Sequence, residues 1–234
     1  MDEIEIIEHI PLKEKKPIVI TGLTGPGLVA NTSAKHIIKE MGLKLRAELR
    51  SKMIAPMIMY QNGGLLNPLR IYSDDEGKII FIVCDTPLDT ESAWQIGERI
   101  TKYLEELNVR EYVLIESMPF QIQSGNRVVF GFGSYSRDVS SFGVSPIAEG
   151  GISGLNAVIV DYASKHKTPW LTLIASTSAS AMIDYGGALG IVTVLNKMFD
   201  LDVDVTFLEK TSNLASRPME ESKRRGGVLD FLRR

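Results

Sequence analysis

Apolar and polar residues at the start of the chain follow the order strand, glycine turn, helix. Residues 18–20 form a short β-branched run of the kind found in buried strands. Glycines at positions 22–27 interrupt this run, and apolar residues then recur at helical spacing from Leu28 to Met41. This β-turn-α unit is the piece from which α/β folds are built.

The same two patterns predict the remaining elements. Strands are predicted over residues 4–8 (at an edge of the sheet), 44–50, 69–72, 78–84, 113–115 and 169–175, and helices over residues 90–107, 155–163 and 186–199. Thr90 suits the N-cap of its helix, and residues 74–77 are typical of a hairpin tip. Residues 117–145 mix glycines with aromatic side chains, which we interpret as one hairpin or extended segment that exposes those aromatics.

Together these elements predict an α/β fold in which helices flank a central mixed sheet in three layers. A chain of 234 residues can bury one large core, so we expect a single α/β domain over residues 1–208. After Leu208 the apolar density falls and charged residues gather. Residues 209–234 are therefore predicted to form a charged C-terminal helix or a mobile tail.

Charge and composition favour a cytoplasmic protein. The net charge is −3 and 24% of the residues are charged, so neither a nucleic acid nor a membrane is expected as a partner. No apolar run reaches the ~20 residues that cross a bilayer, and acidic residues interrupt the start of the chain, so no signal peptide is expected. Cys84, the single cysteine, lies in an apolar run and is predicted to be a buried, unreactive thiol.

Two glycine turns are candidates for ligand binding. They contain Gly22, Gly25 and Gly27 in the first turn, and Gly150, Gly151 and Ser153 in the second. Glycine lets a phosphate approach the N–H groups of a helix N-terminus, but it also lets a chain turn tightly beside a neighbour. The first turn reads G-x-x-G-x-G rather than G-x-G-x-x-G, and no G-K-[ST] follows it. This spacing favours a structural role over nucleotide binding.

No residues have the spacing of a metal site or of a catalytic serine. His9, His36 and His166 each lack a second ligand nearby in the sequence, so neither a metal nor a cofactor is expected. Ser153 lacks the second glycine of G-x-S-x-G and suits a helix cap better than a nucleophile.

Asp85 and Glu116 are the best candidates for acid–base chemistry, since each ends a predicted buried strand. Open α/β sheets place their sites at the carboxyl ends of strands, so a carboxylate pair there could do acid–base work or hold a ribose. Each carboxylate could equally cap the loop or helix that follows it. Sequence separation does not decide between these roles, so no catalytic residue is assigned.

Three segments together resemble the proteasome assembly chaperone 2-like family. They are I-V-I-T-G-L-T-G-P-G-L-V-A from Ile18, E-G-G-I-S-G-L-N-A-V-I-V from Glu149 and A-S-A-M-I-D-Y-G-G-A-L-G-I-V-T-V-L-N from Ala179. The run G-G-I-S-G-L-N-A is the most specific part. The resemblance covers residues 18–208 and implies an α/β fold similar to the nucleoside phosphorylase fold, homo-oligomers and no established catalysis.

The resemblance also implies what the protein does. Archaeal members look like chaperones that help proteasome α and β subunits to assemble without ATP. We therefore expect an ATP-independent chaperone-like protein, not an enzyme, with proteasome subunits or another assembly factor as partners. The alternative is an enzyme of the nucleoside phosphorylase or hydrolase type that holds phosphate at the first glycine turn. A purely structural subunit of a larger complex is a third hypothesis.

The C-terminal tip is the candidate partner-binding element, because family members often bind through a C-terminal tail, sometimes ending hydrophobic-Tyr-X. Its residues here are Val228, Leu229, Phe231, Leu232, Arg233 and Arg234. The last three residues read Leu-Arg-Arg and lack that tyrosine. A frayed helix that packs on its own domain and a peptide that docks in a partner's pocket therefore both remain open.

Overall fold

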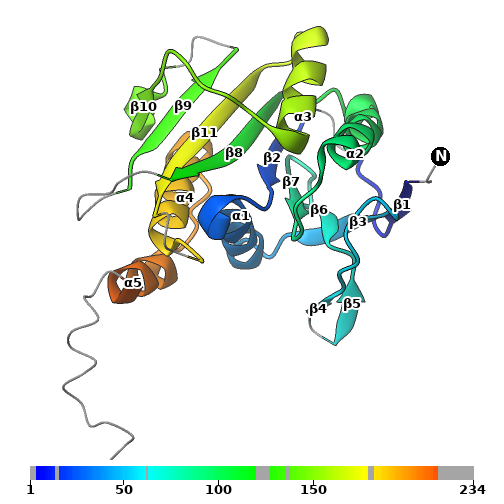
Figure 1. Cartoon of the computed structure of the whole chain (residues 1–234), viewed down its shortest axis with the longest axis horizontal. Coiled ribbons are helices and arrows are strands. Elements are labelled where there is room, and N and C mark those ends of the chain that lie inside the picture. The colour runs from blue at the N-terminus through cyan, green and yellow to red at the C-terminus, as the bar shows by residue number, and fades with distance from the viewer. Residues whose placement is uncertain are drawn as a thin grey trace, which may run out of the picture.

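The computed structural model describes residues 4–13, 16–61, 63–119, 127–134, 138–178 and 182–215. Its core is a nine-stranded sheet in the order β1-β3-β6-β7-β2-β8-β11-β9-β10 (Figure 1). The strands are β1 (Glu5–Glu8), β2 (Ile18–Gly22), β3 (Lys44–Arg50), β6 (Leu69–Ser73), β7 (Ile79–Cys84), β8 (Glu111–Pro119), β9 (Val129–Gly133), β10 (Val144–Pro146) and β11 (Trp170–Thr177).

The middle of this sheet is parallel and buried on both faces. β2 pairs in parallel with β7 and with β8, and β8 pairs in parallel with β11. Ile80, Phe81, Ile82 and Val83 of β7 are all 0% exposed. Their run is apolar without alternation because helices cover both faces of the sheet. The carboxyl ends of these strands meet at one edge, where open α/β sheets bind their ligands.

Antiparallel strands extend the sheet on both sides. β1 pairs with β3 and lies at the edge, as predicted for residues 4–8, and β6 and β7 form the hairpin predicted around residues 74–77. On the other side, β9 lies between β11 and β10. The prediction of an aromatic segment exposed over residues 117–145 is therefore wrong where that segment is described. Phe132 is half-buried because β9 belongs to the main sheet, and Phe142, in the short 3-10 helix Ser140–Phe142, is half-buried against the core.

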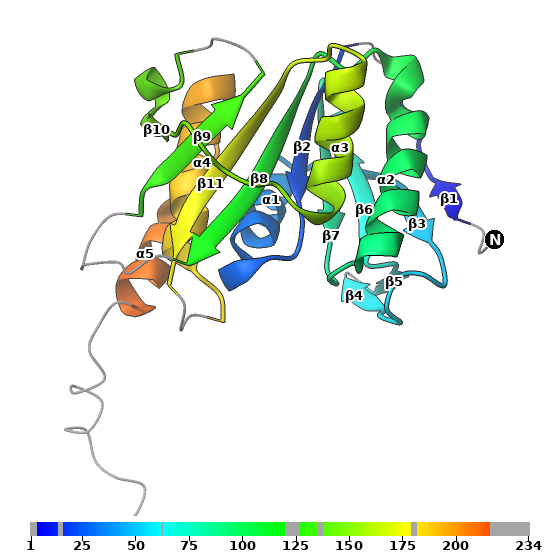
Figure 2. The same cartoon turned by 45° about the horizontal axis from the view of Figure 1, so that its top comes forward.

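Helices cover the two faces of the sheet (Figure 2). They are α1 (Val29–Glu40), α2 (Thr90–Leu104), α3 (Gly154–Lys165), α4 (Tyr185–Phe199) and α5 (Thr206–Ala215). α2 and α3 pack on one face around Ile96 and Ile159, and α1 and α4 pack on the other around Ile37 and Ile191. The predicted α/β fold, with a central mixed sheet between helices, is confirmed. Within the described ranges, no helix combines the length and apolarity needed to span a bilayer.

Acidic residues cap two of these helices. Asp89, not the predicted Thr90, is the N-cap of α2, and its carboxylate accepts the backbone N–H of Ser92 at 2.8 Å. Asp184 caps α4 in the same way. The negative charge of a carboxylate is also stabilised by the positive end of the helix dipole, whereas a threonine hydroxyl carries no charge. Ser153 is the N-cap of α3, as predicted, but its side chain makes no capping hydrogen bond.

α5 begins at Thr206, before the domain boundary expected at residue 208, and Leu208 is buried against the core. The start of the predicted C-terminal segment is therefore a helix that packs on α4. Residues 216–234 lie outside the described residues. With them lies every residue of the predicted partner-binding tip, namely Val228, Leu229, Phe231, Leu232, Arg233 and Arg234.

A small hairpin projects from the main sheet (Figure 1). Its strands β4 (Met59–Gln61) and β5 (Gly64–Leu66) pair with each other and form a separate sheet. The hairpin connects β3 to β6 and follows Pro56, where the sequence predicts that strand pairing breaks.

Candidate functional site

The two glycine turns meet at one cavity of about 210 Å³, at the carboxyl ends of β2, β7 and β8. Thr24 and Gly25 of the first turn and Ser153 of the second contribute to its walls, together with Glu116 and Asn156. The turns are far apart in the sequence. The pairing of β2 with β8 and the packing of α3 on β8 bring them together.

Most of the other candidate glycines are closely packed. A Cβ atom at Gly22 would lie 2.3 Å from a side chain of α1, and one at Gly27 would lie 2.4 Å from a hydroxyl group at the end of β11. A Cβ at Gly150 would lie 2.9 Å from an aromatic ring of β9, whereas Gly151 has open space around it. None of these four glycines contributes to the described walls of the cavity. The contacts of Gly22 and Gly27 support the structural role that the spacing favours.

Replacing Gly27 by alanine should lower the free energy of unfolding by about 1 to 3 kcal/mol. Gly27 has a φ of 61°, where side chains other than glycine are strained, and the added methyl group would contact Thr177. Gly151→Ala is the matched control, because the same methyl group enters open space and should change stability by less than about 1 kcal/mol. Chemical denaturation measures both variants. Equal stabilities would contradict a packing role for Gly27.

Glu116 and Asn156 form a buried polar pair in the wall of the cavity. The side-chain amide of Asn156 donates to Glu116 Oε1 at 2.8 Å and to the carbonyl oxygen of Ile115 at 3.3 Å. Asn156 is 2% exposed, and its Oδ1 has no hydrogen-bond partner among the described residues. Burial raises the pKa of Glu116, and the hydrogen bond from Asn156 opposes this only in part. The expectation that Glu116 ends its strand is wrong, since β8 continues to Pro119.

The hydroxyl groups around the cavity leave their oxygen lone pairs available. Thr24 Oγ1 donates its proton to the carbonyl oxygen of Cys84 at 2.8 Å, and Ser117 Oγ donates to that of Pro26 at 2.7 Å. Both oxygens can therefore still accept a hydrogen bond. No lysine or arginine lies among the described lining residues. Among the lining side chains, Glu116, Thr24 and Ser117 thus offer acceptors, whereas the backbone N–H groups at the N-terminus of α3, which its N-cap side chain does not bond, are donors.

Asp85, the other carboxylate candidate, belongs to a separate network. Its carboxylate forms ion pairs with Arg70 and Lys35 and accepts the side-chain amide of Asn31 at 3.0 Å. Burial alone would raise the pKa of Asp85, but these cations and hydrogen bonds outweigh it and hold the pKa below its usual range. Asp85 is not among the described residues that line the cavity. The structure therefore does not combine Asp85 and Glu116 into one carboxylate pair.

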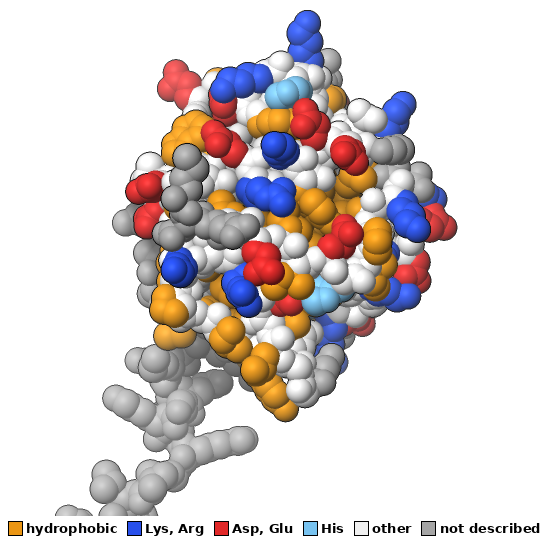
Figure 3. All heavy atoms as spheres, turned by 90° about the vertical axis from the view of Figure 1, so that its right-hand side faces the viewer, with side chains coloured by type: hydrophobic (Ala, Val, Ile, Leu, Met, Phe, Trp, Pro, Cys, Tyr) orange, Lys and Arg blue, Asp and Glu red, His pale blue; other side chains and the backbone are white. Residues whose placement is uncertain are grey.

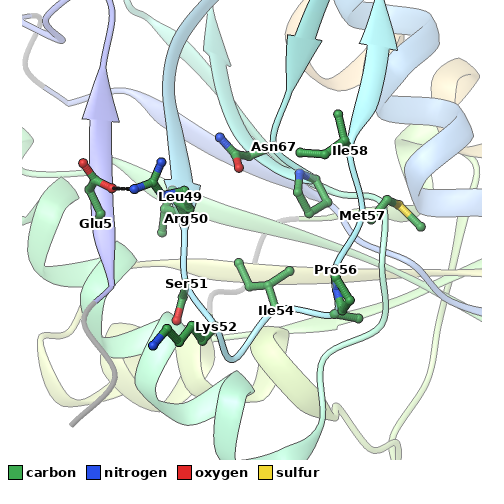
Figure 4. Close-up of a pocket in the computed structure, with 12 residues that line it drawn as sticks. Glu5, Leu49, Arg50, Ser51, Lys52, Ile54, Pro56, Met57, Ile58 and Asn67 are labelled. Carbon is green, nitrogen blue, oxygen red and sulfur yellow. Dashed lines mark ion pairs between the residues drawn. The ribbon is translucent and has the colours of Figure 1, made fainter.

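A second feature is an open groove of about 1160 Å³ between the end of β3 and the segment that leads into the hairpin (Figure 4). Ile54, Pro56 and Ile58 line its apolar side. On the opposite side, Arg50 forms an exposed ion pair with Glu5 at 3.2 Å. The groove is therefore amphipathic and open to solvent, as expected of a surface that contacts another protein.

The hairpin beside this groove presents an apolar face without a single charge. Tyr60 and Leu65 lie directly opposite each other on β4 and β5 and are 74% and 71% exposed. Residues 53–69 contain no charged side chain. The space-filling view shows hydrophobic side chains in the middle of this side of the molecule and down to its lower tip (Figure 3). Exposed apolar clusters of this kind mark interaction sites.

Exposed apolar side chains also lie on α5 and before α4. Phe207 in the first turn of α5 and Leu214 near its end are exposed, and so is Met182 in the segment before α4. The ring of Phe207 stacks on His36 at a centroid distance of 6.3 Å and meets Tyr185 edge-on at 6.1 Å. These contacts hold Phe207 in place at the surface.

The sequence did not reveal the role of Asn156 or the apolar hairpin. The unpaired oxygen of Asn156 depends on its neighbours in three dimensions and leaves no signal in the sequence. The lack of charge over residues 53–69 could have indicated the hairpin surface. Within the described ranges, His, Cys, Asp and Glu side chains form no group of three that could hold a metal ion.

A comparison with family models identifies one family. A model of the PAC2 family matches residues 19–222. An uncharacterized protein of Methanocaldococcus jannaschii is 24% identical over 224 residues, which cover 94% of this chain and 91% of that protein.

Two solved structures from Pyrococcus furiosus share the fold. PbaA, an archaeal homologue of proteasome-assembly chaperone, is 27% identical, with a TM-score of 0.82 over 94% of this chain and 90% of that one. PbaB, an archaeal proteasome activator, is 19% identical, with a TM-score of 0.80 over 96% of this chain and 100% of that one.

Proposed function

Because the chain belongs to the PAC2 family, we propose that it is an ATP-independent, chaperone-like protein that assists proteasome assembly in the cytoplasm through protein–protein contacts. The observation that carries this proposal is the likeness to PbaA, a homologue of proteasome-assembly chaperone, over nearly the whole of both chains. The partners are proteasome subunits or another assembly factor. No catalysis is part of this proposal.

Contact with the proteasome subunits is assigned to the tail and to the exposed apolar side chains on α5 and before α4. Phe207 and Leu214 are exposed on α5, the helix that precedes the tail in the sequence, and Met182 is exposed before α4. The tip of the tail carries Val228, Leu229, Phe231 and Leu232 among basic residues. A partner pocket that accepts apolar side chains and carries negative charge at its rim would fit this peptide.

Contact between copies of this chain is assigned to the hairpin. Tyr60 and Leu65 form an apolar pair that no described part of the chain covers, and the apolar side of the groove lies next to it. An isolated two-stranded hairpin is marginally stable in water, so burial against a second copy would stabilise it. A homo-oligomer built through this face removes the uncharged surface over residues 53–69 from water.

The enzyme hypothesis has one observation in its favour, the cavity at the carboxyl ends of the strands. The described lining of the cavity contains Glu116 but no lysine or arginine. The carboxylate of Asp85 is already in ion pairs with Arg70 and Lys35. A phosphorylase would need donors or cations for phosphate. Thermal-shift screening with phosphate and nucleosides tests this alternative directly.

Deleting residues 226–234 should leave the fold intact and weaken the capture of proteasome subunits, because the apolar tip supplies the docking peptide. The experiment compares the full chain, the truncated chain and a variant with Phe231→Ser and Leu232→Ser in pull-downs of α and β subunits. Glu220→Ser with Glu221→Ser is the matched control in the same tail. Equal capture by all variants would contradict the role of the tip, whereas no capture by the full chain would contradict the proposed function.

A further inference from the structure

We propose that the cavity between the two glycine turns binds a small aliphatic amine, whose ammonium group pairs with the carboxylate of Glu116. This binding site is independent of the surfaces assigned to protein contacts. It lies at the carboxyl ends of β2, β7 and β8, whereas the hairpin and α5 lie outside its walls.

The polar groups of the cavity call for a ligand that donates hydrogen bonds. Glu116 Oε1 accepts from Asn156, which leaves the second carboxylate oxygen of Glu116 for a ligand. The hydroxyl groups of Thr24 and Ser117 donate their hydrogen bonds to backbone carbonyl oxygens, so toward a ligand they can only accept. Asn156 Oδ1 adds a buried acceptor that has no hydrogen-bond partner in the part of the chain that the structure describes. An ammonium group has three protons to donate, which matches these acceptors.

The charge of the site also favours a cation. In the described part of the chain, no lysine or arginine forms an ion pair with Glu116, although Asp85 has two such partners. A buried carboxylate without a counter-ion is costly, and an ammonium ligand would supply the missing positive charge.

The remaining walls fit a short hydrocarbon chain. Leu23, Leu88, Ile115 and Leu155 line the cavity, and Pro26 belongs to the same wall. The volume of about 210 Å³ lies below the roughly 300 to 1,000 Å³ typical of pockets for drug-sized ligands. The cavity is therefore too small to enclose a nucleotide, and its described lining offers a phosphate no lysine or arginine, whereas an amine with a few carbon atoms fits within its volume.

The test is calorimetric titration of the full chain with n-butylamine, with n-butanol and butyrate as the neutral and anionic analogues. We expect saturable binding of n-butylamine alone. Glu116→Gln should weaken it at least tenfold, and Thr24→Val should weaken it less. Glu149→Gln removes the same charge outside the cavity and should change the dissociation constant by less than a factor of two.

Folding of the variants is checked separately by thermal unfolding. Glutamine keeps an acceptor for Asn156 and removes a buried ionisable group, so Glu116→Gln should melt at or above the temperature of the wild type. No saturable binding of n-butylamine would overturn the proposal. Equal binding of n-butanol or butyrate, or unchanged binding by a folded Glu116→Gln variant, would overturn it as well.

Discussion

Replacing Arg70 by methionine should lower the free energy of unfolding by about 3 kcal/mol at neutral pH. Arg70 is 2% exposed, and its guanidinium forms an ion pair with Asp85 and donates to the carbonyl oxygen of Asn67 at 2.9 Å. Methionine leaves the buried carboxylate of Asp85 with Lys35 as its remaining cation. The cost therefore lies near the lower end of what removing one partner of a buried ion pair typically costs.

The pH dependence of this variant follows from the pKa of Asp85. That pKa is lowered in the folded protein, so the stabilisation is present above the pKa of the unfolded chain, about 3.9, and is lost as the pH falls through the folded value. The difference between wild type and Arg70→Met should therefore be largest at neutral pH and shrink in acid. Arg50→Met, which breaks the exposed pair with Glu5, is the control and should cost less than about 1 kcal/mol.

Urea denaturation at several pH values measures both arginine variants. A cost for Arg70→Met that equals the cost for Arg50→Met would contradict a structural role for the buried pair. A cost that stays constant between neutral and acidic pH would show that Asp85 is not the group that Arg70 stabilises.

Replacing both Tyr60 and Leu65 by serine should convert the proposed homo-oligomer to monomers without unfolding the domain. The two side chains form one exposed apolar face on the hairpin. As apolar anchors of the interface, the two side chains together should contribute about 2.7 kcal/mol, so the dissociation constant should rise about a hundredfold. Light scattering across a concentration series measures the change in mass.

The control for the hairpin variant removes two exposed apolar side chains elsewhere. Trp94→Ser in α2 with Val128→Ser before β9 should leave the mass unchanged. A hairpin variant that keeps the mass of the wild type would place the contact between copies on another surface. A wild-type chain that is monomeric at every concentration would contradict the homo-oligomer itself.

Local patterns in the sequence were sufficient for most of the fold. The apolar run of β7 predicts a buried central strand, since its side chains must be apolar on both faces. The β6–β7 hairpin and the edge position of β1 follow from turn residues and mixed polarity. β9 could not be placed, because its partner β11 is distant in the sequence and its aromatics resemble an exposed segment.

The candidate sites were harder to predict because they depend on pairings between distant segments. Asp85 and Glu116 both follow apolar strand residues, and their local sequences do not show that Asp85 has two cations beside it and that Glu116 has none among the described residues. Gly25 and Ser153 line the same cavity only because of which strands are neighbours in the sheet, and this order is likewise not visible in their local sequences. The uncharged stretch over residues 53–69 was readable in the sequence, but its exposure was not.

The most direct test of the proposed role is size-exclusion chromatography with light scattering, run on the full chain alone and mixed with proteasome α subunits in the absence of ATP. The account predicts a complex that elutes with a mass above that of either component. Elution of the two components as separate species, each with its own mass at every mixing ratio, would contradict it.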